Sequence, residues 1–75
     1  MTAPALELEI EEAWDALTRC NRPRTVYLTH GHRLVWGSTA EQNQELHEVG
    51  TYGRGITLSD FRDDVFHVWH HRGRK

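Results

Sequence analysis

Six histidines in a chain of 75 residues are the first side chains that could do chemistry, because imidazole nitrogens bind transition metals. His30 and His32 flank Gly31 in an expected turn, and three more histidines lie near the end of the chain, at His67, His70 and His71. A strand over residues 65–70 would place His67 and His70 on opposite faces. No recognised zinc spacing is present, so the sequence predicts neither a metal site nor a cofactor.

The candidate nucleophiles have no visible base beside them. Cys20 is the single cysteine, which excludes an intrachain disulfide and zinc sites built on several cysteines. A nucleophilic cysteine needs a positioned base, and Ser59-Asp60 has no histidine signature around it. The glycines at 50, 53 and 55 fit turns rather than a phosphate loop. The sequence therefore predicts a protein that is not an enzyme.

Size and charge limit the remaining classes of protein. The length fits one small domain over residues 1–75, with mobile ends at 1–3 and 71–75. A formal net charge of −2 argues against a dedicated, sequence-independent nucleic-acid binder. Without a signal peptide or a long apolar run, we expect a cytoplasmic protein that does not bind membranes.

The first expected element is an amphipathic helix from Pro4 to about residue 20. Its apolar stripe has helical spacing and consists of Leu6, Ile10, Ala13, Trp14 and Leu17. Residues 6–10 also alternate as a half-buried strand would, but the stripe continues past Ile10 and favours the helix.

Residues 25–37 are typical of a β-hairpin with a two-residue turn at His30-Gly31, in which Gly31 supplies a positive φ. This turn pairs Leu28 with Arg33 and Tyr27 with Leu34. One face then carries Val26, Leu28, Arg33 and Val35, and the other carries Tyr27, Thr29, His32, Leu34 and Trp36.

The second half allows two interpretations at its start. Residues 39–48 could form a short helix, or the chain could turn at 41–44 and return as a strand over 45–52, which we favour. A strand at 56–58, a tight turn capped by Ser59 and a final strand at 65–70 follow. The expected fold is α+β, an N-terminal helix followed by a small antiparallel sheet or a five-stranded SH3/Sm-like barrel.

Three phrases carry a family resemblance: Val26-x-Leu28-x-x-Gly31-x-x-Leu34-x-x-Gly37, Arg54-Gly55-Ile56 and Ile56-x-Leu58-x-x-Phe61-x-x-Val65. With the helical start, they resemble Sm-like proteins and the small Rho-binding antiterminators that share their barrel. The aspartate and asparagine that bind RNA in true Sm proteins are missing from the first strand pair. The antiterminator resemblance implies docking on a nucleic-acid-handling machine through acidic residues, here Glu7, Glu11, Glu12 and Asp15.

The leading hypothesis is a non-enzymatic module that docks on a larger machine of transcription or nucleic-acid processing, as phage inhibitors and regulators do. Aromatic and arginine side chains favour interface centres, and Trp36 and Trp69 are expected as exposed anchors. The predicted contact residues are Glu7, Glu11, Glu12, Asp15, Tyr27, His32, Arg33, Trp36 and Trp69.

Two alternatives remain open. The first is an RNA- or DNA-binding barrel, which would use the basic residues Arg22, Arg24, Arg33, Arg72, Arg74 and Lys75. The second is a homo-oligomer in which barrel edges pair with one another.

Overall fold

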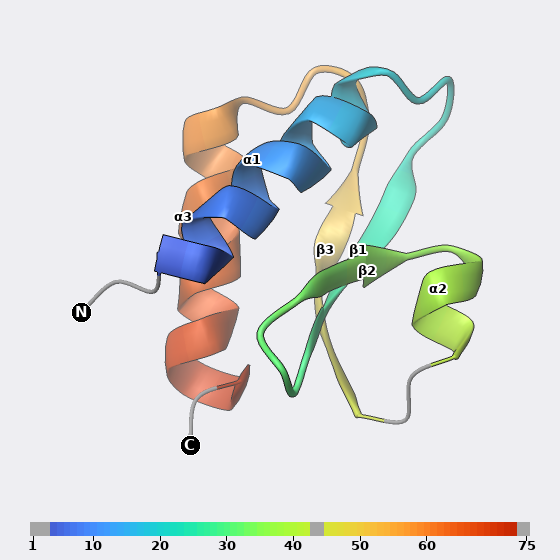
Figure 1. Ribbon diagram of the computed structural model, residues 1–75. Helices are drawn as coiled ribbons and strands as arrows, with labels where there is room; N and C mark the ends of the chain where they lie inside the picture. The colour runs from blue at the N-terminus through green and yellow to red at the C-terminus, as the bar shows by residue number, and fades with distance from the viewer. Residues whose placement is uncertain (1–3, 43–44, 74–75) are drawn as a thin grey trace.

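The computed structural model describes residues 4–42 and 45–73 and has an α+β architecture. Its elements are α1 (Pro4–Thr18), β1 (Arg24–Thr29), β2 (Leu34–Trp36), α2 (Ser38–Glu41), β3 (Leu46–Tyr52), α3 (Leu58–Val68) and a π-helical turn η1 (Trp69–Gly73). The three strands form one antiparallel sheet in the order β2-β1-β3. Helices α1 and α3 lie together beside the sheet, and α2 lies apart from them (Figure 1).

Helix α1 confirms the expected N-terminal helix. Leu6, Ile10, Ala13 and Leu17 are all buried, so the predicted stripe is the face that packs on the core. Val26 and Leu28 of the central strand β1 are fully buried in the same cluster. The sheet therefore has an inner face against α1 and α3 and an outer face on the opposite side.

The hairpin exists, but its predicted two-residue turn and register are wrong. The amide of His32 donates to the carbonyl of Thr29 at 3.0 Å, and the amide of Thr29 donates to the carbonyl of Arg33 at 2.8 Å. This is a three-residue loop, in which His32 rather than Gly31 adopts the left-handed conformation, with φ 62°.

The added loop residue shifts the pairing by one position. Leu28 pairs with Leu34 and Val26 pairs with Trp36. Because neighbouring residues in a strand point to opposite faces, the shift reverses the predicted faces of β2. Leu34 and Trp36 therefore lie on the inner face with the core, while Val35 joins Tyr27 on the outer face.

The middle of the chain contains both of the elements that were weighed against each other. Residues 38–41 form the single turn α2, and the favoured strand is present as β3. A helix extending to residue 48 is excluded, because β3 begins at Leu46.

The C-terminal prediction of two strands around a tight turn is wrong, because residues 58–68 form helix α3. The side chain of Thr57, not Ser59, caps this helix by accepting the amide of Asp60 at 3.1 Å. Phe61, Val65 and Val68 have helical spacing and are buried. Burial of this stripe outweighs the strand propensity of residues 65–70, and the fold is an open three-stranded sheet rather than a five-stranded barrel.

Polar contacts fix α1 to the rest of the fold. The indole Nε1 of Trp14 donates to the carbonyl of Ile56 at 3.0 Å, and Oε1 of Glu9 accepts the amide of Leu34 at 3.0 Å. Residues 71–73, which were expected in a mobile tail, belong to η1, and the other residues expected to be mobile, 1–3 and 74–75, lie outside the described residues. Within the described chain, no helix is long and apolar enough to cross a membrane.

Candidate binding surface

The outer face of the sheet is the part of the structure that α1 and α3 leave uncovered. Tyr27 lies on this face in the central strand and is half-buried, since it alternates with the fully buried Val26 and Leu28. Beside Tyr27, Val35 of β2 is 8% exposed, and the neighbouring helix α2 buries Ala40. Helix α2 therefore forms a wall along one side of an otherwise accessible sheet face.

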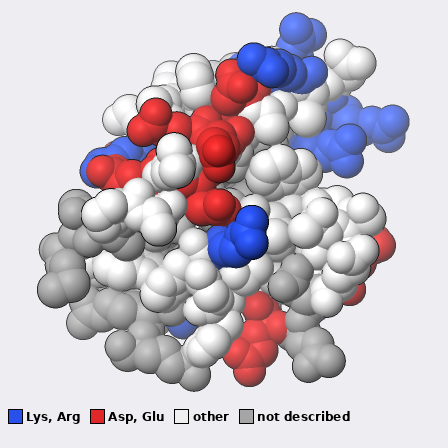
Figure 2. All heavy atoms as spheres, viewed as in Figure 1, with Lys and Arg blue, Asp and Glu red and all other residues white. Residues whose placement is uncertain are grey.

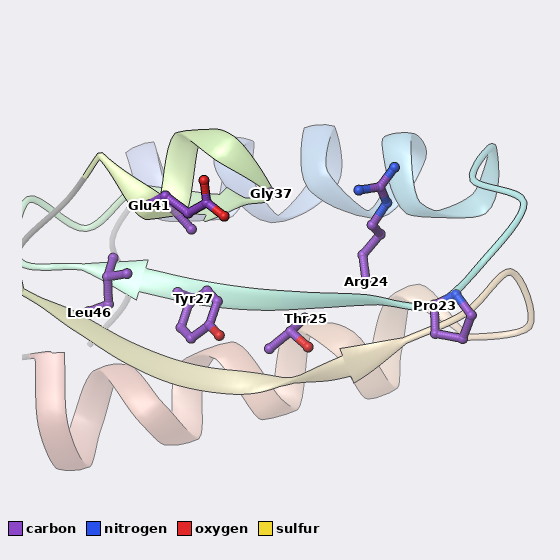
Figure 3. Close-up of a pocket in the computed structure, with 8 residues that line it drawn as sticks. Pro23, Arg24, Thr25, Tyr27, Gly37, Glu41 and Leu46 are labelled. Carbon is purple, nitrogen blue, oxygen red and sulfur yellow. The ribbon is translucent and has the colours of Figure 1, made fainter.

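A groove of about 390 Å³ lies between this wall and the sheet, and we call it the outer groove (Figure 3). Pro23 and Arg24 lie at one end of it, and Glu41 and Leu46 lie at the other. Its full lining consists of Pro23, Arg24, Thr25, Tyr27, Gly37, Ala40, Glu41 and Leu46. The size is within the range of ligand-binding clefts.

The outer groove has a charge at each end and a largely uncharged floor. Arg24 and Glu41 are both exposed, and neither forms an ion pair with another described residue. Between them lie the Tyr27 ring and Thr25, whose hydroxyl is 2.8 Å from that of Thr51 on β3. The sequence predicted Arg24 as a nucleic-acid contact and Tyr27 as a protein contact, and the fold places both in one groove.

A cluster of arginines adjoins the Arg24 end of the outer groove. Arg24 pairs with Tyr52 across β1 and β3, so residues 22–24 and 52–54 lie side by side. This adds the exposed Arg54 to Arg22 and Arg24. Figure 2 shows basic side chains at this end of the molecule, next to the acidic side chains over α1. Arg54 was not predicted, because its place in the cluster depends on pairing between segments distant in sequence.

The four predicted acidic contact residues of α1 are not all free of partners within the protein. Glu7 accepts a 2.6 Å hydrogen bond from Nε of Arg62 on α3, and Asp15 forms an ion pair with Arg19 at 3.2 Å. Glu11 and Glu12 are exposed and have no ion pair within the described part of the chain. Two of the four predicted carboxylates are thus already partnered within the protein.

The predicted aromatic anchors lie elsewhere than expected. Trp69 is 5% exposed and belongs to the core, and Trp36 packs against that core from the inner face. The ring of His32 meets Trp69 edge-on, with centroids 5.9 Å apart, and Nε of Arg33 approaches Glu9 at 4.0 Å. Of the predicted aromatic contacts, only Tyr27 lies in the outer groove.

The residues predicted to bind nucleic acid are divided between two ends of the sheet. Arg22 precedes β1 and Arg24 is its first residue, whereas Arg33 follows the hairpin loop at the other end of that strand. Five residue steps along β1 separate the two ends by roughly 17 Å. Arg72 lies in η1, which packs beside β1 and the hairpin. Arg74 and Lys75 lie outside the described residues.

The described residues contain no group of three or more His, Cys, Asp and Glu side chains placed to hold a metal ion. Comparisons with protein-family models, with curated proteins and with solved structures found no match. The shape and charge of the outer groove therefore remain the guides to function.

Proposed function

We propose that this chain is a non-catalytic module that binds a larger protein by receiving an extended segment of it in the outer groove. The observation that carries this proposal is the half-buried Tyr27 on the central strand of an uncovered sheet face, beside the wall formed by α2. Tyrosine favours interface centres, because its ring supplies a large contact area and its hydroxyl a hydrogen bond.

The charges at the ends of the outer groove define the chemistry of the bound segment. Arg24 suits an acidic side chain or a terminal carboxylate, and Glu41 suits a basic side chain. Tyr27 and Leu46 between them suit an apolar residue. We propose a cytoplasmic machine of transcription or nucleic-acid processing as the protein that carries this segment, with the module acting as its regulator or inhibitor.

A peptide-library selection tests this function. We expect wild-type protein to enrich peptides with an acidic residue at one end and a basic residue at the other. Arg24→Glu should change the acidic position to a basic one, because the groove then presents a carboxylate there. Arg33→Glu is the matched control, since it makes the same charge change at an exposed site outside the groove.

Two results would contradict the groove as the binding site. One is a selection that enriches no common sequence. The other is the same enriched sequence for Arg24→Glu as for Arg33→Glu and wild type. Tyr27→Ser gives an independent measure, because loss of the ring should weaken an enriched peptide by about tenfold or more.

The cluster of Arg22, Arg24 and Arg54 favours single-stranded nucleic acid as a second candidate ligand. Contacts of arginine with phosphate release counterions, so binding of this kind weakens steeply as salt rises. Titration with labelled single-stranded RNA and DNA at low and moderate salt should then show salt-dependent binding, which Arg54→Ala reduces. Absence of binding at low salt excludes this candidate and leaves the protein ligand.

A further inference from the structure

The end of helix α3 and the turn η1 that follows it bring together two histidines that a strand would have separated. His67 and His71 are four residues apart, and their ring centroids lie 4.5 Å from each other with an angle of 42° between the ring planes. Both side chains are exposed, His67 in the last turn of α3 and His71 in η1. The pair is therefore accessible from solvent and is distant in sequence from the residues of the outer groove.

The π-helical turn contributes to this approach. Residues 69–73 form η1, so the chain widens between His67 and His71. Its i→i+5 hydrogen bonds give a π-helix more residues per turn than the 3.6 of an α-helix, so a residue four positions later lies more nearly above the first. Two histidines four residues apart on one helical face are also the arrangement that binds zinc in metalloproteases.

The spacing of the rings matches that of two imidazoles on one metal ion. With metal–nitrogen distances near 2.0–2.1 Å, a ring centroid lies about 3.2 Å from the metal. Two such rings at a right angle have centroids about 4.5 Å apart, and at a tetrahedral angle about 5.2 Å apart. The observed 4.5 Å is therefore compatible with both imidazoles binding one ion at a right angle, the angle in square-planar and tetragonal complexes.

We propose that His67 and His71 form a two-imidazole site for a divalent transition metal, with Cu²⁺ bound most tightly and Ni²⁺ and Zn²⁺ less tightly. The order follows from the general affinity of nitrogen ligands for these ions. Water fills the other coordination positions, because no third ligand joins the pair among the described residues. His70 is excluded from the site, since its ring packs against Trp69, with centroids 4.8 Å apart.

Calorimetric titration of the untagged full chain with CuCl₂, in a buffer that does not bind metals, tests the site. We expect one Cu²⁺ per chain. His67→Gln and His71→Gln should each weaken binding by about tenfold or more, because one imidazole alone loses the advantage of chelation. His70→Gln is the matched control, an exposed histidine between the two ligands, and should stay within about twofold of wild type.

Electron paramagnetic resonance of the bound Cu²⁺ gives a second readout. The wild-type spectrum should show two coordinating nitrogens, and the spectrum of either ligand variant should show one. The proposal is overturned if wild type binds no Cu²⁺, if both ligand variants bind it as tightly as wild type, or if His70→Gln weakens it as much as they do. Circular dichroism of each variant separates loss of a ligand from loss of the helix.

Discussion

The phenolic hydroxyl of Tyr52 donates a 2.9 Å hydrogen bond to Oδ2 of Asp64 and so joins β3 to α3. The Tyr52 ring is 7% exposed and meets Phe61 edge-on, with centroids 5.0 Å apart. Burial, together with the hydrogen bond from Tyr52 to Asp64 and the charge of that carboxylate, raises the pKa of the Tyr52 phenol. Ionisation of Tyr52 at high pH would therefore weaken the contact between the edge strand β3 and α3.

Tyr52→Phe should remove that coupling. In wild type, the unfolded chain ionises Tyr52 near its ordinary pKa of 10.0, while the folded chain keeps the proton. The contribution of Tyr52 is therefore complete below pH 10 and declines as pH rises further, by up to about 1.4 kcal/mol per pH unit. The variant should lose about 1 kcal/mol at pH 7 through the missing hydrogen bond and lack this part of the alkaline decline.

Urea unfolding of both proteins at pH 7, 10 and 11 measures this difference. Tyr27→Phe serves as the control, because Tyr27 is half-buried and no described side chain hydrogen-bonds to it. Equal alkaline loss of stability in wild type and Tyr52→Phe would contradict the role of the Tyr52–Asp64 contact.

Gly50→Ala should disturb the same contact from the other side. A β-carbon at Gly50 would lie 2.7 Å from the hydroxyl oxygen and 3.0 Å from Cζ of Tyr52, so the ring must move. We expect a loss of about 1–3 kcal/mol in the free energy of unfolding. Gly55→Ala is the matched control, since its β-carbon meets no atom within 4 Å, and it should change stability by less than about 0.5 kcal/mol. Similar losses of stability in both variants would contradict a clash with the Tyr52 ring as the cause of the loss in Gly50→Ala.

The N-terminal helix could be predicted from the sequence because its apolar stripe continues from Leu6 to Leu17 and only one period fits it. The C-terminal segment gave two conflicting signals. Its run of Val65, Phe66, Val68 and Trp69 has strand propensity, while the spacing of Phe61, Val65 and Val68 fits a helix. Propensity is the weaker of the two, because burial of a stripe against α1 and the sheet outweighs local preference.

The candidate sites, too, could be predicted only in part from local sequence. Arg24 and Tyr27 were recognisable as binding residues by type, but Ala40 and Glu41 join them only because α2 folds back over the outer face. His67 and His71 could not be paired while residues 65–70 were assigned to a strand. In each case the missing information is a tertiary contact.

Gly31→Ala and Gly37→Ala should distinguish the observed hairpin from the one that the sequence suggested. Gly31 has no positive φ, and its β-carbon would only contact Oγ1 of Thr29 at an ordinary 3.9 Å. Its replacement should be neutral or stabilise the fold by up to about 1 kcal/mol, through lower entropy of the unfolded chain. Gly37 has φ 63° and ψ −141°, a conformation that side chains with a β-carbon rarely adopt, so Gly37→Ala should cost about 1–3 kcal/mol. Thermal unfolding of the two variants should therefore shift the melting temperature in opposite directions or by clearly different amounts. A two-residue turn at His30-Gly31 would instead make Gly31→Ala the destabilising change.

Thr57→Ala should show that α3 begins with a cap at Thr57. The hydroxyl of Thr57 accepts the amide of Asp60 at 3.1 Å, and the amide of Phe61 donates to the Thr57 carbonyl at 3.0 Å. Loss of the hydroxyl leaves the first turn without its side-chain acceptor, at a cost of about 1 kcal/mol. Ser59→Ala is the matched control, an exposed hydroxyl inside the first turn, and alanine has the higher helix propensity there. Urea unfolding should therefore show a lower midpoint for Thr57→Ala and an unchanged or higher one for Ser59→Ala, and the reverse order would place the start of the helix at Ser59.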